Sequence, residues 1–109
     1  WMWTVCCTDW ASTQASAVMR RVRACTDKPL WAKLTPNTGE IANVARAAEE
    51  GGADALVVAN TVLGMAIDTE TRRPKLGNVM GGLSGPAIKP VALRCAWECV
   101  RSVSTKPAG

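Results

Sequence analysis

The stretch Asp54-Ala55-Leu56-Val57-Val58-Ala59-Asn60 decides the fold class of this chain. Its central residues form a continuous apolar run, which is typical of a parallel β-strand that is buried on both faces. A second strand is expected at Leu30–Thr35, where Leu30, Ala32 and Leu34 share one face.

Helices are expected on either side of these strands. Apolar residues recur at helical spacing over residues 12–24 and 40–50, and Gly51-Gly52 follows the second run as a stop signal. A last helix is expected over residues 86–103, with apolar positions at Ile88, Leu93, Ala96, Trp97 and Val100. Alternating helices and strands predict an α/β fold with a parallel sheet. Residues 1–10 show no clear period, and residues 62–80 form either a functional loop or a small hairpin.

Composition favours a folded, soluble domain. The 109 residues are 48% hydrophobic and 20% charged, with a net charge of +4. No apolar run approaches the roughly 18 residues that a membrane span needs, and no secretory leader is evident. We therefore expect a cytoplasmic protein that does not enter a membrane. The basic residues Arg20, Arg21 and Arg23 are interpreted as a solvated helix face, so no nucleic-acid partner is expected.

The five cysteines give little support to a metal site or a disulfide framework. Their number is odd, and the sequence contains no histidine to complete a zinc site beside Cys95 and Cys99. Those two residues are four apart and are expected to be buried as small hydrophobic side chains. Cys6 and Cys7 are weak nucleophile candidates because no histidine is present to act as their base.

Polar and glycine residues follow the predicted strands at the places where ligands bind in parallel α/β folds. Lys33 is a cation within an apolar strand, and Asn60-Thr61 ends the next strand. The stretch Gly81-Gly82-Leu83-Ser84-Gly85-Pro86 precedes the last helix. The carboxyl ends of parallel strands lie at one edge, so these three segments are expected to converge there. The alternatives are an exposed edge lysine and a glycine-rich loop that only starts a helix.

The sequence resembles class 1 dihydroorotate dehydrogenases, and most closely the subclass that passes electrons to NAD through a partner subunit. The resemblance runs from about Asp27 to the last helix, over most of the chain. It is carried by four separated motifs in the right order: Lys33-Leu34-Thr35-Pro36-Asn37, Gly51-Gly52-Ala53-Asp54, Val58-Ala59-Asn60-Thr61 and Gly81-Gly82-Leu83-Ser84-Gly85-Pro86-Ala87-Ile88-Lys89-Pro90-Val91-Ala92-Leu93.

The resemblance implies a (β/α)₈ TIM barrel with FMN at its carboxyl face, and oxidation of dihydroorotate to orotate in pyrimidine biosynthesis. It implies that Lys33, Ala59 and Gly85 contact FMN, and that Asn60 and Thr61 bind the orotate ring. A cation beside the flavin would stabilise negative charge on its reduced form. The resemblance also implies an oligomer, and an iron–sulfur/FAD subunit that delivers electrons to NAD.

Two departures from the family pattern limit the site. The loop Asn-x-Ser-Cys-Pro-Asn that carries the family's base is absent, so no catalytic residue is assigned and neither Cys6 nor Cys7 is promoted. The glycine pairs that hold the flavin phosphate are expected after later strands, and a complete barrel takes about 250 residues. Residues 1–109 are therefore interpreted as one partial domain, an interior fragment of the barrel that is inactive by itself.

Two other functions remain open at this point. One is the flavin domain of a dihydropyrimidine dehydrogenase, which has similar Leu-Thr-Pro-Asn and Asn-Thr motifs and would reduce uracil or thymine. The stretch Met65–Lys75 fits the first family better. The other is a non-catalytic α/β fragment that associates with a partner through exposed strand edges.

Overall fold

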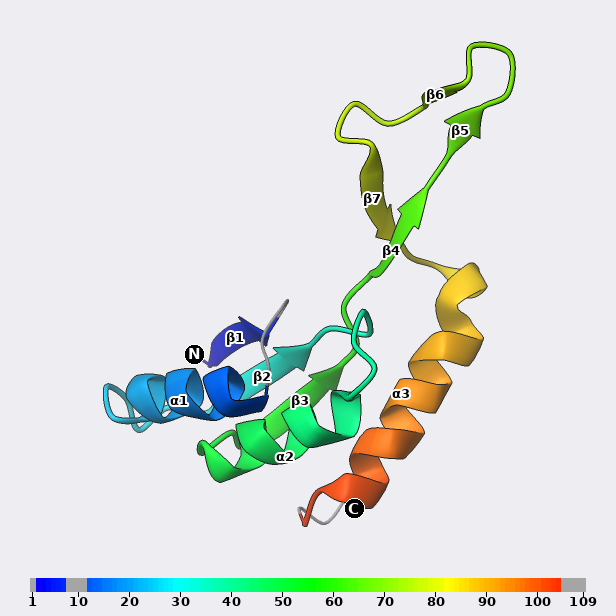
Figure 1. The fold of residues 1–109 in the computed structure, drawn as a ribbon. Coiled ribbons are helices and arrows are strands. Elements are labelled where there is room, and N and C mark those ends of the chain that lie inside the picture. The colour runs from blue at the N-terminus through cyan, green and yellow to red at the C-terminus, as the bar shows by residue number, and fades with distance from the viewer. Residues whose placement is uncertain (1, 8–11, 105–109) are drawn as a thin grey trace.

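A computed structural model describes residues 2–7 and 12–104 of the chain. Three parallel strands form the body, in the order β1 (Trp3–Cys7), β2 (Leu30–Leu34) and β3 (Ala55–Val58). Helices α1 (Ser12–Arg23) and α2 (Ile41–Glu50) connect them and cover one face of the sheet (Figure 1). A short 3₁₀ helix, η1 (Pro86–Ile88), leads into α3 (Lys89–Ser102), which packs beside α2. The expected parallel α/β fold is confirmed.

The first strand was not expected from the sequence. Trp3–Cys7 pairs with β2 in parallel, with Cys6 opposite Lys33 and Cys7 opposite Leu34. Strand β2 pairs in turn with β3, where Lys33 lies opposite Val57. The body therefore consists of three successive strand–helix units. Neighbouring strands of the sheet are also neighbouring strands in sequence, as in a barrel wall.

The core lies between the sheet and its helices. The three β2 residues expected on one face, Leu30, Ala32 and Leu34, are fully buried, as is Met19 of α1. Helix α2 contributes the apolar stripe Ile41, Val44, Ala45, Ala47 and Ala48. Because the alternate residues of β2 are only half buried, the face of the sheet opposite the helices is left uncovered by the described residues. That face carries Lys33.

Helix α3 packs against the core through the face that carries Cys95 and Cys99. Cys95 and Cys99 are buried against the core, as expected for small hydrophobic thiols, and burial raises the pKa of Cys99 to about 11. Leu93, Trp97 and Val100, which are among the other apolar positions expected in this helix, are 68%, 64% and 63% exposed. Two apolar stripes therefore run along this helix, and only one of them faces the core.

Residues 62–83 form an arm that projects away from the body (Figure 1). Strand β4 (Val62–Met65) pairs antiparallel with β7 (Met80–Leu83), and β5 (Ile67–Asp68) pairs with β6 (Arg73–Pro74) nearer the tip. Of the two possibilities left open for this connection, the hairpin is confirmed. Gly81 and Gly82 therefore lie in a strand rather than in a loop, and Gly85 alone caps η1.

An ion pair fixes the amino end of β2. The Asp54 carboxylate accepts hydrogen bonds from the Leu30 N–H at 2.7 Å and from the Arg23 guanidinium at 2.5 Å. The hydrogen bond from the Leu30 N–H, and to a smaller extent the hydrogen bond and charge of Arg23, lower the pKa of Asp54 below its ordinary value of 3.8. The group is largely exposed, which limits the size of the effect on stability.

The pKa of Asp54 is lower in the folded state than in the unfolded state, so its ionised carboxylate stabilises the fold at pH values above the unfolded-state pKa. This contribution is lost as the pH falls through the folded-state pKa. We expect Asp54→Asn to lower the free energy of unfolding at neutral pH and to flatten its decline below about pH 4. Urea denaturation at several pH values measures this. The control is Asp27→Asn, because Asp27 is exposed and belongs to neither of the ion pairs among the described residues. Parallel pH profiles for wild type and Asp54→Asn would contradict the assignment.

In the part of the chain that the structure describes, no helix is both long and apolar enough to cross a membrane.

Candidate functional site

The predicted site residues gather where β2 and β3 end. Lys33 is the penultimate residue of β2, and Asn60 follows β3 by two residues. The Asn60 N–H donates to the Leu34 carbonyl at 2.8 Å, so the two strand ends remain joined beyond the last residue of β3. The peptide bond between Val58 and Ala59 is cis. The expected convergence of the Lys33 and Asn60-Thr61 segments is therefore seen in the structure.

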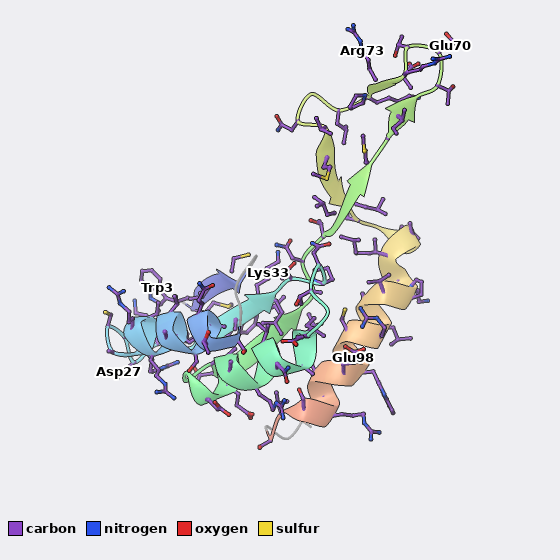
Figure 2. All side chains as sticks on the ribbon, viewed as in Figure 1. Trp3, Asp27, Lys33, Glu70, Arg73 and Glu98 are labelled. Carbon is purple, nitrogen blue, oxygen red and sulfur yellow. The ribbon has the colours of Figure 1, made fainter. Side chains whose placement is uncertain are left out.

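Lys33 is half buried on the face of the sheet opposite α1 and α2 (Figure 2). Strand alternation explains this position, because Ala32 and Leu34 on either side of it point into the core. Across residues 2–7 and 12–104, Lys33 takes part in neither of the two ion pairs. Among these residues Lys33 therefore has no acidic partner, which leaves its charge available to a ligand.

The Asn60 side chain lies beside the end of β1. Its Nδ2 donates to Cys6 Sγ at 3.5 Å, and its Oδ1 accepts the Thr61 N–H at 2.9 Å. An amide carries two donors and two acceptor positions, so within the described residues Asn60 retains one of each for a ligand. This contact was not expected, because residues 1–10 gave no periodic signal. Cys6 is exposed.

Asn37 joins the two loops at this edge, and the sequence reasoning assigned it no role. Its Nδ2 donates to the Thr61 carbonyl at 3.0 Å and to Thr35 Oγ1 at 3.2 Å. Its Oδ1 accepts the Leu63 N–H at 2.8 Å. The signal available in the sequence was its place in the Lys-Leu-Thr-Pro-Asn motif, at residues 33–37.

The glycine-rich stretch meets the same edge through Gly82. A Cβ atom at Gly82 would lie 2.6 Å from Thr61 Oγ1, so a side chain there would collide with Thr61. Gly85 lies further along and has φ +80°, a conformation that L-residues with side chains rarely adopt. A Cβ atom at Gly85 would meet nothing within 4 Å. The backbone beside Gly85 is therefore open to close approach by a flat molecule.

The residues present fit the flavin side of an FMN site. A cation at Lys33, which forms no ion pair with the described residues, suits a ring that gains negative charge on reduction. The open backbone at Gly85 suits close contact with a planar group. Among the described residues no cluster of histidine, cysteine or carboxylate side chains could hold a metal ion.

Parallel strand–helix units with polar groups gathered at the carboxyl ends of their strands place this chain in the class of parallel α/β proteins, in which ligands usually bind at that edge. Comparison with known proteins identifies which kind. The family model described as "Dihydroorotate dehydrogenase" matches residues 9–106. The chain belongs to the dihydroorotate dehydrogenase family, a TIM-barrel family, which confirms the resemblance. Cys6 lies outside the matched residues, so the family match assigns it no role.

The chain is similar to several curated proteins named "Dihydroorotate dehydrogenase B (NAD(+)), catalytic subunit". It is 52% identical over 99 residues to the protein from Solidesulfovibrio magneticus, covering 91% of this chain and 31% of that one. It is 56% identical over 95 residues to the protein from Trichlorobacter lovleyi and 50% identical over 95 residues to that from Bacteroides thetaiotaomicron, in each case covering 87% of this chain and 31% of the relative. The chain thus spans about a third of the length of these relatives.

Proposed function

We propose that this chain is part of the catalytic subunit of an NAD-linked dihydroorotate dehydrogenase, which oxidises dihydroorotate to orotate in pyrimidine biosynthesis. The observation that carries the proposal is the meeting of Lys33, Asn60 and Thr61 where β2 and β3 end. The names and identities of the relatives support it. Among the described residues, the proposed site combines a cation that forms no ion pair with an amide that keeps one donor and one acceptor position free.

In the proposed site, Asn60 and Thr61 bind the pyrimidine ring. The ring presents neighbouring N–H and C=O groups along its edge, and an amide complements both. Because Asn60 Oδ1 and Nδ2 each keep a free position, the side chain can pair with this edge without losing its contacts to Thr61 and Cys6. Asn60 therefore orients the substrate while β3 keeps its place in the sheet.

Lys33, Ala59 and Gly85 are proposed to contact FMN. Bound FMN would supply the acceptor for the hydride removed from dihydroorotate, and the neighbouring carbon would lose a proton. The Lys33 ammonium, held on a strand whose other face is buried, stabilises the negative charge that develops at the ring. Ala59 and Gly85 offer backbone rather than side-chain contact. No base is assigned among these residues.

The three strand–helix units are proposed to form an arc of a (β/α)₈ barrel, with the Lys33 face of the sheet turned toward the barrel interior. Residues 1–109 then make up one partial domain, which by itself neither holds FMN tightly nor turns over. The full-length enzyme is proposed to be a cytoplasmic oligomer. An iron–sulfur/FAD subunit passes its electrons to NAD.

The substrate distinguishes this proposal from a dihydropyrimidine dehydrogenase. The full-length protein that carries this chain should bleach its flavin on anaerobic addition of dihydroorotate. Uracil or thymine, offered to the reduced protein, should leave the flavin reduced. Reoxidation by uracil without reduction by dihydroorotate would favour the dihydropyrimidine enzyme. A concentration-dependent oligomer that binds no flavin would favour a non-catalytic role.

Replacing Asn60 tests the substrate side of the site. We expect Asn60→Ala to raise the KM for dihydroorotate about tenfold, as the loss of one or two hydrogen bonds would do, with a smaller effect on kcat. Steady-state kinetics of the full-length enzyme measure both constants. The matched control is Asn78→Ala. Asn78 lies in the arm, and its side chain takes part in no hydrogen bond among the described residues. An unchanged KM in Asn60→Ala would remove Asn60 from the site.

A further inference from the structure

Asn37 is exposed, but its side chain makes several hydrogen bonds at the edge where β2 and β3 end. Its side-chain amide bonds to backbone groups on either side of Val62: it donates to the Thr61 carbonyl at 3.0 Å and accepts the Leu63 N–H at 2.8 Å. These partners are 24 and 26 residues away in sequence. One side chain therefore connects the loop after β2 to the start of the arm.

The Asn37 side chain is itself held in place. Thr35, which is 6% exposed, accepts the Asn37 backbone N–H at 3.1 Å and the Asn37 Nδ2 at 3.2 Å through its hydroxyl oxygen. Two bonds from one residue to a buried hydroxyl restrict both the backbone and the side-chain torsions of Asn37. The amide is thereby aimed at the Thr61–Leu63 segment before any ligand binds.

The geometry points to Asn37 as a positioning residue for substrate binding, acting through Asn60 and Thr61. The segment from Val58 to Val62 leaves the sheet after one short strand and enters the arm. At its near end the Asn60 N–H is held by the Leu34 carbonyl, and at its far end Asn37 holds Thr61 and Leu63. With both ends fixed, the Asn60 amide keeps the orientation that the pyrimidine edge requires. This inference rests on the proposed function.

The removal of Asn37 should loosen this segment rather than unfold the protein. Asn37→Ala leaves the Thr61 carbonyl and the Leu63 N–H without these partners, but both groups are in exposed residues and water can replace the bonds. The body of the core, which consists of Leu30, Leu34, Ile41 and their neighbours, does not include Asn37. We therefore expect weaker ligand binding with unchanged FMN content.

Equilibrium titration of the full-length, FMN-loaded enzyme with orotate, followed through the flavin absorbance, tests the inference. Asn37→Ala should raise the Kd for orotate and the KM for dihydroorotate by about tenfold, with kcat changed less than threefold. Asn78→Ala is the control and should bind orotate as wild type does. If Asn37→Ala matched this control, the inference would be overturned.

A double-mutant cycle separates positioning from a general loss of structure. If Asn37 acts through Asn60, the effect of Asn37→Ala on the Kd should shrink below twofold in an Asn60→Ala background, because the effects of residues that are coupled through a shared backbone segment do not add. A full, additive effect in that background would overturn the inference. Should Asn37→Ala fail to retain FMN, Asn37→Asp replaces it in the cycle, since the carboxylate keeps the acceptor for Leu63 N–H.

Failure of the proposed function would look different from failure of this inference. If the wild-type protein were not reduced by dihydroorotate and did not bind orotate, the proposed function would fall, and the inference with it. If the wild type binds orotate and reacts while Asn37→Ala is indistinguishable from Asn78→Ala, only the role of Asn37 falls.

Discussion

Replacing Lys33 with alanine should slow reduction of the flavin by dihydroorotate about 100-fold, the typical cost of losing one preorganised group that stabilises developing charge. Lys33 lies on the face of the sheet opposite α1 and α2 and outside both described ion pairs, so its charge is available to a bound ring. Rapid mixing of the full-length enzyme with dihydroorotate under anaerobic conditions measures the reduction rate. The Kd for orotate should change much less.

Two further variants make the Lys33 experiment specific. Lys33→Arg keeps the positive charge and should recover part of the lost rate. Lys28→Ala removes an exposed lysine just before the amino end of the same strand and should leave the rate unchanged. Equal losses in Lys33→Ala and Lys28→Ala, or a loss confined to the Kd for orotate, would contradict a role for Lys33 at the flavin.

Gly51→Ala should lower the free energy of unfolding by about 3 kcal/mol, at the upper end of the usual range for overpacking a core. Gly51 ends α2 at φ −76°, so its backbone conformation is open to any residue. The obstacle is space: an added Cβ would lie 2.5 Å from Met19 Cβ and 2.9 Å from the Ser16 carbonyl oxygen. Since Met19 is fully buried, α1 must move away from α2 to admit one methyl group.

Urea denaturation compares this variant with Gly39→Ala, where an added Cβ would meet nothing within 4 Å. The control should differ from wild type by less than about 1 kcal/mol, the size of a typical propensity or surface effect. If Gly51→Ala were no less stable than Gly39→Ala, the close packing of α1 on the end of α2 would be wrong.

Elements with a single strong pattern were predictable from the sequence. Strand β2 alternates buried and half-buried residues, and α2 has one apolar stripe, so both were expected within one residue of their observed ends. Helix α3 was placed correctly, and the expected burial of Cys95 and Cys99 is confirmed, but the sequence did not decide whether its other apolar positions would be buried. Cys95 and Cys99 recur at helical spacing, as do Leu93 and Trp97, and spacing cannot tell which stripe α2 will cover.

The contacts that complete the candidate site depend on tertiary structure. Strand β1 is identified by its pairing with β2, because its own five residues show no clear alternation. The contact between Cys6 and Asn60 spans 54 residues and follows from that pairing. Asn37 bonds to backbone groups of a distant segment, which no local periodicity reports. Lys33 was singled out as a cation in an apolar strand, and Asn60 and Gly85 because they stand beside strand or helix ends. Their roles at FMN and orotate come from the family resemblance and remain predictions.

A crystal structure of the full-length protein with FMN and orotate tests the central claim most directly. The account predicts the orotate ring within hydrogen-bonding distance of Asn60 and Thr61, and the flavin ring against Lys33, Ala59 and Gly85. Orotate or FMN bound at an edge of the sheet that these residues do not reach would contradict it.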